Sequence, residues 1–290
     1  MNSIIEIKNL CKKYGNKAAL SDFCLDINEN GIYGLLGRNG AGKTTLLNTL
    51  AGIETQSSGS IHIFGNTHSS QRSLNESLCY VMEDSNFNQG LKVKEILGLA
   101  AMQYSKWDAE FAKKLIRDFS IDPNLTYNKL SKGLKTIVGN IIGLSSNSPI
   151  VIYDESYSGL DAFARKQFNE EMISNYSEHP KIVIMSSHLI EETNRLFDNI
   201  IILKEGRLLL FDSTENLASR CYAINGRKEE VEAFTKSMNV LKMDYMGSIV
   251  SAQIMNRLTD ENLIDLRKRN LTYEMNTLQS MFIAITEKAV

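Results

Sequence analysis

The stretch GLLGRNGAGKTTLLNTL, residues Gly34–Leu50, decides the fold, because it places four glycines within nine residues and follows them with Lys-Thr-Thr. Its central part, Gly37–Thr44, fits the pattern G-x-x-x-x-G-K-[ST] of a phosphate-binding loop. Glycines let the backbone curl until successive N–H groups point at phosphate oxygens, and the helix that follows adds its positive N-terminal end. An apolar strand precedes the loop, as this motif requires. The stretch therefore predicts a phosphate site between a strand and a helix of an α/β fold.

The pattern gives individual residues of the loop an expected role. Lys43 reaches the β- and γ-phosphates, Thr44 offers its hydroxyl to Mg²⁺, and Thr45 continues the helix beside the α-phosphate. A flexible glycine-rich turn is one alternative; a dinucleotide-binding loop is another, but it would need the spacing G-x-G-x-x-G. We expect the nucleotide to be bound by Gly37, Arg38, Asn39, Gly40, Ala41, Gly42, Lys43, Thr44 and Thr45.

A pair of carboxylates follows a second apolar run, IVIYDES, residues 150–156. Ligands of α/β proteins lie at the carboxyl ends of the strands, which is where this run places Asp154 and Glu155. Asp154 is expected to hold Mg²⁺, directly or through water. Glu155, one residue further, is expected to face the γ-phosphate as the general base or as the group that orients the attacking water. The alternative is an ordinary strand that ends in polar residues. The presence of a phosphate loop in the same chain disfavours this alternative.

Composition and charge exclude some classes of protein. The chain has 290 residues, room for about two domains, and it is 43% hydrophobic. A formal net charge of −2 argues against nucleic acid as the main partner. We find no signal peptide and no apolar run long enough to span a bilayer, so we expect any membrane attachment to be peripheral.

Hydrophobic periodicity divides the chain into regions with different patterns of secondary structure. Short β-like runs and one helix occupy the first 66 residues, and a helical pattern follows from about 91 to 146. Strands and helices then alternate, with a hairpin over 199–212 whose turn is Glu205-Gly206. The segment 221–290 indicates the order β-α-β-β-α-β-α, typical of a small accessory domain.

Taken in order, these motifs resemble the ATP-binding subunit of ABC (ATP-binding cassette) transporters, over roughly residues 1–212. The resemblance implies an α/β fold: a P-loop NTPase core with an antiparallel β subdomain and an inserted helical subdomain at about 84–147. It also implies ATP and Mg²⁺ as cofactors. Residues 213–290 are then the C-terminal accessory domain, of α+β class.

The resemblance gives further residues a role. LSKGLK (130–135) is similar to the family signature, by which Ser131 and Gly133 of one subunit would cap the γ-phosphate bound to a second subunit. SGLD (158–161) is similar to the loop that crosses between subunits, which assigns Asp161 to the nucleotide site. His188, directly after a strand, is expected at the γ-phosphate, and Tyr14 is expected to stack on adenine.

Two positions depart from the family's pattern. The signature has Lys132 where glycine is usual, which adds a positive charge near phosphate. After the run LCYVM the family has Gln, a Mg²⁺ contact, whereas this chain has Glu83. Because Glu also offers an oxygen to Mg²⁺, we expect the role to survive with an added negative charge.

The expected function is ATP binding and hydrolysis that powers a membrane transporter by closure of two ATP-binding subunits, identical or related. The membrane spans would lie on a separate permease polypeptide, which would hold this chain at the cytoplasmic face of the membrane. The tail is similar to ATPases of the ABC-2 export type, a group that includes exporters of antimicrobial and cytolytic peptides such as phenol-soluble modulins. An importer ATPase, or a non-transport ABC ATPase acting on a soluble complex, stays open as an alternative.

Overall fold

The computed structural model describes residues 3–67, 77–83, 87–187, 190–193 and 195–288. The chain forms two compact units, each with a core of its own. The first comprises residues 1–188 and 201–210, and the second comprises residues 189–200 and 211–290. The chain therefore enters the second unit, returns to the first for a short stretch, and then leaves it again.

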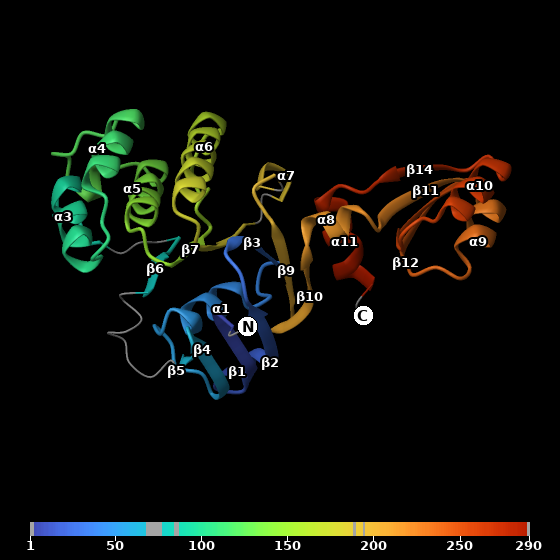
Figure 1. The fold of residues 1–290 in the computed structure, drawn as a ribbon, viewed down its shortest axis with the longest axis horizontal. Helices are drawn as coiled ribbons and strands as arrows, with labels where there is room; N and C mark the ends of the chain where they lie inside the picture. The colour runs from blue at the N-terminus through green and yellow to red at the C-terminus, as the bar shows by residue number, and fades with distance from the viewer. Residues whose placement is uncertain (1–2, 68–76, 84–86, 188–189, 194, 289–290) are drawn as a thin grey trace. The chain divides into compact units, whose positions relative to one another are not determined.

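A six-stranded sheet organises the first unit, in the order β10-β9-β3-β8-β7-β6 (Figure 1). The pairs β3–β8, β8–β7 and β7–β6 are parallel. β3, β7 and β8 are buried throughout, as expected of strands covered on both faces. The strand bounds are β3 (Gly31–Leu36), β6 (Leu78–Val81), β7 (Ile150–Asp154), β8 (Ile182–Ser186), β9 (Asn199–Lys204) and β10 (Arg207–Ser213).

The hairpin between β9 and β10 turns at the two residues that the sequence predicted. Glu205 and Gly206 have φ values of 49° and 74°. Two successive positive φ values define the type I′ turn, whose twist matches that of the strands it joins. The Gly206 N–H donates to the carbonyl of Ala41, which attaches this turn to the phosphate loop.

A second, antiparallel sheet has the order β2-β1-β4-β5. Its apolar side chains join those of the parallel sheet in one core, which includes Ile5, Phe23 and Ile184. Helix α1 (Lys43–Leu50) begins at the end of the phosphate loop and contacts both β2 and β7. The strand bounds are β1 (Ile5–Tyr14), β2 (Lys17–Ile27), β4 (Ser58–Ile63) and β5 (Asn66–Thr67).

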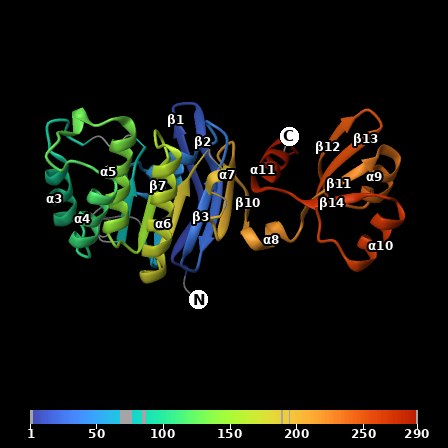
Figure 2. The ribbon, with the colours of Figure 1, turned by 90° about the horizontal axis from the view of Figure 1, so that it is seen from above.

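The helical subdomain lies beyond β6, where Figures 1 and 2 both show α3, α4 and α5 side by side. Capping residues start two of its helices: the carboxylate of Asp108 accepts from Phe111 N at 2.9 Å, and the hydroxyl of Ser131 accepts from Leu134 N at 3.2 Å. Helix α5 packs on β6, β7 and α6. The helix bounds are α3 (Val93–Gln103), α4 (Ala109–Asp118), α5 (Lys132–Ser145) and α6 (Ala162–Glu178).

The second unit contains a four-stranded antiparallel sheet in the order β12-β13-β11-β14. Chain order β-α-β-β-α-β with this strand order is the ferredoxin-like arrangement. Helices α9 and α10 supply Val231, Phe234 and Leu266 to a core against the sheet. The bounds are β11 (Cys221–Arg227), α9 (Lys228–Thr235), β12 (Val240–Met246), β13 (Ile249–Met255), α10 (Asp260–Lys268), β14 (Thr272–Met275) and α11 (Leu278–Lys288).

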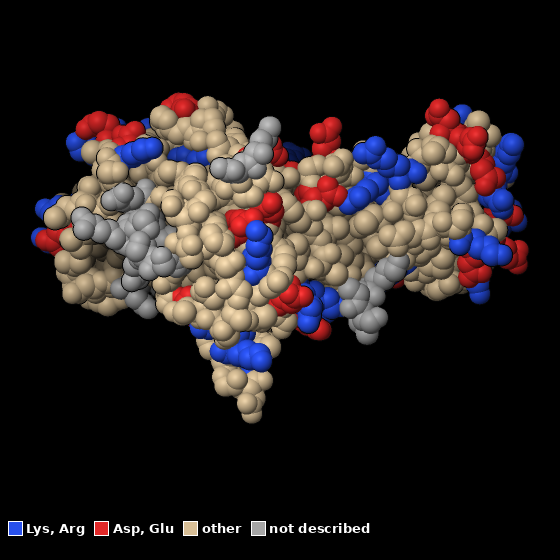
Figure 3. Space-filling view, turned by 60° about the horizontal axis from the view of Figure 1, so that its bottom comes forward, with Lys and Arg blue, Asp and Glu red and all other residues tan. Residues whose placement is uncertain are grey.

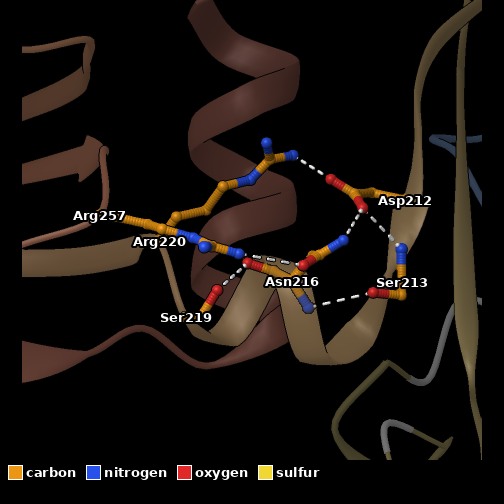
Figure 4. Close-up of polar contacts among 6 residues, drawn as sticks. All are labelled: Asp212, Ser213, Asn216, Ser219, Arg220 and Arg257. Carbon is orange, nitrogen blue, oxygen red and sulfur yellow. Dashed lines mark hydrogen bonds and ion pairs between the residues drawn. The ribbon is translucent and has the colours of Figure 1, made fainter.

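A polar network fixes the short helix α8 (Thr214–Ala218), which precedes this sheet (Figure 4). Ser213 caps the helix by accepting from Asn216 N at 3.1 Å. Asn216 in turn donates to Asp212 Oδ1 at 3.2 Å and accepts from Arg257 Nη2 at 3.3 Å. Arg220 pairs with the other oxygen of Asp212. Side chains from both ends of α8 and from the region after β13 therefore hold this helix in place.

Candidate functional site

One cavity of about 550 Å³ collects most of the expected nucleotide residues. It opens along the phosphate loop and the start of α1, with Tyr14 from the end of β1 and two expected site carboxylates, Glu83 and Glu155, besides Glu205. The lining residues are Tyr14, Lys17, Ala18, Ala19, Asn39, Gly40, Ala41, Gly42, Lys43, Thr44, Thr45, Glu83, Glu155 and Glu205. Gly37 and Arg38 belong to the loop but do not line the cavity.

The phosphate loop has the backbone that its glycines predicted. Gly40 and Gly42 have φ values of 81° and 108°, a region that side chains with a Cβ rarely adopt. A Cβ on Gly42 would lie 2.6 Å from the carbonyl oxygen of Ala19, and one on Gly37 would lie 2.8 Å from that of Leu203. The loop therefore needs glycine at both positions, at Gly42 for conformation as well as space.

Lys43 lies under the loop rather than in solvent. Its side chain is buried, and Nζ donates to the carbonyl oxygen of Gly37 at 2.8 Å. This contact places the ammonium group inside the curve of the loop, where it can reach phosphate oxygens that the backbone N–H groups bind.

Asp154 and Glu155 end β7 and are held by the neighbouring strand. Asp154 is buried and lies opposite Ser186 in the register of β7 and β8. The Ser186 hydroxyl donates to Asp154 Oδ1 and accepts from Glu155 N at 3.0 Å. The Tyr80 hydroxyl lies 3.3 Å from Asp154 Oδ2. Glu155 has a φ of 52°, which turns the chain sharply and puts this residue on the cavity wall.

Tyr14 is held at the edge of the cavity by two charged neighbours. Its hydroxyl donates to Glu54 Oε2, and Lys12 Nζ lies 5.0 Å from the centre of its ring. Lys12 also forms an ion pair with Glu54 at 3.1 Å. The residue Tyr14 is nevertheless 47% exposed, so a flat base can stack on it.

Glu83 contacts both the other departure from the family's pattern, Lys132, and the SGLD loop. Its Oε1 accepts from Ser158 Oγ at 3.2 Å and lies 3.5 Å from Lys132 Nζ. The lysine that replaces the usual glycine of the signature thus faces the glutamate that replaces the usual glutamine. The extra positive charge and the extra negative charge compensate each other within one chain.

Three expected residues lie away from the cavity of their own chain. Ser131 and Asp161 are the N-caps of α5 and α6, and their side chains accept from Leu134 N and Ala164 N. Gly133 abuts the loop that contains Gly159: a Cβ there would lie 2.5 Å from the carbonyl oxygen of Gly159. This location agrees with a role toward a second subunit, which stays a prediction. His188 lies outside the described residues.

The side chains present fit a nucleotide with a divalent cation. The loop backbone and Lys43 are donors for phosphate oxygens, while Thr44 and Glu83 offer hydroxyl and carboxylate oxygens on the cavity wall. Asp154, which is buried and does not line the cavity, lies directly before Glu155 and offers a further carboxylate. Mg²⁺ prefers such oxygens and is usually bound through one or two carboxylates together with substrate phosphates and water. A set of phosphate donors together with carboxylates suits a Mg²⁺-bound triphosphate.

Some residues of the site had no place in the sequence-based prediction. Ser186 was detectable in principle, because it is a polar residue at the carboxyl end of a buried parallel strand. Tyr80, Asn48 and Glu54 gave no comparable signal, since each lies in an apolar or mixed stretch whose partners are distant in sequence.

The comparisons identify the family. The ABC transporter family model matches residues 20–158. An uncharacterised ABC transporter ATP-binding protein of Methanocaldococcus jannaschii is 31% identical over 83% of this chain and 92% of its own length. The chain belongs to the family of ABC transporter ATP-binding proteins. The bacitracin transport ATP-binding protein BcrA of Bacillus licheniformis is 27% identical over 98% of both chains. The phosphonates import ATP-binding protein PhnC of Fusobacterium nucleatum is 30% identical over 73% of this chain and 93% of its own.

Solved structures agree with the fold. The ATP-binding cassette MJ0796, solved as a dimer in a post-hydrolysis state with ADP and Pi, has a TM-score of 0.65. It is 22% identical to this chain and covers 72% of it, while 98% of the cassette is matched. The expected ABC ATPase fold is thereby confirmed. Among the described helices, none is both long and apolar enough to cross a bilayer.

Proposed function

We propose that this chain binds ATP with Mg²⁺, hydrolyses it, and uses the cycle to drive export of a peptide through a separate membrane permease. The observation that carries this proposal is the single cavity that unites the phosphate loop, Tyr14, Glu83 and Glu155, with Asp154 buried beside it. The family membership supports the same reading.

Different residues of the site bind the nucleotide and take part in its hydrolysis. The loop N–H groups and Lys43 bind the phosphates, and Tyr14 stacks on the base. Thr44, Asp154 and Glu83 would hold Mg²⁺, which when bound neutralises charge that develops on the transferred phosphoryl group. Glu155 orients the attacking water, since it lies on the cavity wall and its backbone is fixed by Ser186.

A second subunit would complete the site. Ser131 and Gly133 lie away from the cavity of their own chain but at the exposed start of α5, whose N–H groups suit a γ-phosphate. Closure of two chains would bring those donors to the nucleotide and exclude water, which is most of what phosphoryl transfer needs. The dimer seen for the related cassette supports this arrangement.

The direction of transport is argued from a match that spans almost the whole chain. BcrA, named for bacitracin transport, is similar over 98% of this chain, so the resemblance includes residues 213–290. PhnC, named for phosphonate import, is similar over 73% of it. This difference favours export, with import as the second candidate. The net charge of −2 and the interspersed acidic and basic side chains on the face in Figure 3 support a partner other than nucleic acid.

The chemistry is tested with Glu155→Gln and Lys43→Ala. Because Gln keeps the size of Glu but cannot act as a base, we expect Glu155→Gln to bind ATP as the wild type does and to hydrolyse it about 10²–10⁴-fold more slowly. Lys43→Ala removes a phosphate ligand and should weaken nucleotide binding instead. Steady-state phosphate release and fluorescent-nucleotide titration separate the two effects. Wild-type turnover in Glu155→Gln would remove Glu155 from its proposed role.

The partner is tested by purifying the tagged chain from its native membrane in detergent and identifying the proteins that accompany it. A membrane protein with no cassette of its own supports transport, and its cargo can then be assayed with peptides. A soluble substrate-binding protein in the complex would favour import. Recovery from the cytosol with ribosomes, or alone, would contradict the transport proposal and leave the ATPase proposal standing.

A further inference from the structure

A continuous row of hydrogen-bonded side chains joins Tyr14, on the cavity wall, to the buried Asp154. We call it the Tyr80 relay; it consists of Tyr14, Glu54, Asn48, Tyr80 and Asp154. Tyr14 lines the cavity at the end of β1, and Asp154 precedes Glu155 at the end of β7. Between them the row passes through Asn48 on α1 and Tyr80 on β6, behind the phosphate loop.

The charge of Glu54 determines which atoms donate and which accept in the hydrogen bonds at this end of the row. Burial works against the charge of Glu54, but hydrogen bonds from Tyr14, Asn48 and Lys12 outweigh it, so the pKa of Glu54 lies below its usual value. An ionised carboxylate can only accept hydrogen bonds. Asn48 must therefore turn Nδ2 toward Glu54, at 3.0 Å, which leaves its Oδ1 facing the Tyr80 hydroxyl, also at 3.0 Å.

The Tyr80 hydroxyl has one proton and two acceptors. It lies 3.0 Å from Asn48 Oδ1 and 3.3 Å from Asp154 Oδ2. A tyrosine hydroxyl carries one proton at neutral pH and can donate it. Both acceptors lie within hydrogen-bond distance of the hydroxyl, so the one proton is shared between the amide oxygen of Asn48 and the carboxylate of Asp154.

We propose that Tyr80 is a positioning residue of the site: its hydroxyl orients Asp154 and ties that carboxylate, through Asn48 and Glu54, to the ring of Tyr14. Ser186 binds Oδ1 of Asp154 and Tyr80 approaches Oδ2, so both oxygens of the carboxylate are restrained. The inference rests on the proposed function, because it concerns the cation that Asp154 would hold. Second-sphere contacts of this kind typically change metal affinity about 10–100-fold when removed.

Tyr80→Phe removes only the hydroxyl, and Tyr104→Phe is the matched control. Tyr104 is likewise buried, and its hydroxyl bonds to Cys79 outside the relay. The probe is Mn²⁺, whose binding to the full-length chain with ATP is followed by electron paramagnetic resonance. We expect Tyr80→Phe to weaken Mn²⁺ binding about tenfold and to change ATP affinity without metal less than about twofold. We expect Tyr104→Phe to change neither.

A double-mutant cycle tests the connection to Tyr14. Glu54→Gln alters the far end of the relay, and we expect it to weaken Mn²⁺ binding about threefold. Because both changes interrupt one connected row, Tyr80→Phe with Glu54→Gln should weaken binding no more than about tenfold. A product of the two single effects, about thirtyfold, would overturn the relay, as would unchanged Mn²⁺ binding in Tyr80→Phe or an equal loss in Tyr104→Phe. A wild-type chain that binds no ATP would overturn the proposed function itself.

Discussion

Single polar residues at the ends of buried strands carry the chemistry of this site. Sheet geometry alone predicts that Asp154 and Glu155 lie where ligands bind, and the structure places Glu155 on the cavity wall. The same rule applies to Ser186, which stands opposite Asp154 in the register. What the rule could not predict is that one hydroxyl would hold the side chain of Asp154 and the backbone of Glu155 together.

The remaining contacts depend on tertiary packing. Asn48 and Tyr80 are 32 residues apart, and Tyr80 and Asp154 are 74 apart. No periodicity in the sequence encodes such pairs, since each residue fits its own helix or strand equally well with other partners. Motifs therefore predict the residues that touch the phosphates, and only the folded chain reveals those that position them.

Lys181 is a buried cation at the other end of the parallel strands. It directly precedes β8 and donates to Asn175 Oδ1 at 2.8 Å and Asn147 Oδ1 at 3.3 Å. Burial lowers its pKa from 10.5 to about 8, and the nearby Cys79 only partly opposes the shift. Two amide oxygens solvate the ammonium group less well than water does, so the folded chain releases this proton more easily than the unfolded chain.

This shift predicts a pH-dependent stability that Lys181→Met should abolish. Between about pH 8 and 10.5 the unfolded chain holds a proton that the folded chain has lost, so the free energy of unfolding should rise with pH in this window. The rise, relative to Lys181→Met, should approach about 3 kcal/mol and should be absent below pH 7. Urea titrations of both proteins from pH 7 to 10 measure it. Parallel pH profiles would contradict the assignment.

Helix α5 approaches β7 more closely than side chains usually allow. A Cβ on Gly143 would lie 2.6 Å from the ring of Tyr153, which is buried and stacks edge-on with Phe168 at 5.5 Å. The sequence predicted both the helix and the strand, because their periodicities are clear. Their spacing was not predictable, since a glycine within a helix has no signature that distinguishes close packing from chance.

Two glycine substitutions in neighbouring helices should have opposite effects. Gly143→Ala forces the Tyr153 ring to move, and we expect a loss of about 1–3 kcal/mol in unfolding free energy. Gly98 on α3 has open space around the same position, so Gly98→Ala should gain about 0.5–1 kcal/mol from helix propensity alone. Urea unfolding followed by the fluorescence of Trp107, the only tryptophan, compares the two. A stabilised Gly143→Ala would contradict the close packing.

At the scale of the whole molecule, the ABC ATPase fold followed from motifs in their order, and family membership confirms it. The motifs did not predict how the chain passes between the two units. Residues 189–200 belong with 211–290, although they lie between strands of the parallel sheet in the sequence. Local patterns predict where helices and strands begin and end, but not to which of the two units a segment such as 189–200 belongs.

The proposed pairing of two chains predicts a dimer that depends on ATP. Because Glu155→Gln should trap bound ATP, this variant should show twice the single-chain mass by light scattering with ATP and Mg²⁺, and the single-chain mass with ADP. Adding Ser131→Arg places bulk at the exposed start of α5 and should keep the chain monomeric. Circular dichroism verifies that this variant stays folded. A dimer that forms equally with ADP, or despite Ser131→Arg, would contradict the proposal.

The second unit consists of two separate segments of the chain, and this constrains how related proteins can exchange that unit. Helix α7 (Ile190–Thr193) contacts α11, and Thr214 N donates to the carbonyl of Asp198, so both segments belong to one compact unit. A chimera joined at residue 212 would carry a foreign C-terminal segment against a native α7. A recombinant that transfers residues 189–200 together with 211–290 keeps those contacts intact, and exchange of this module alone requires three junctions, before residues 189, 201 and 211, rather than one.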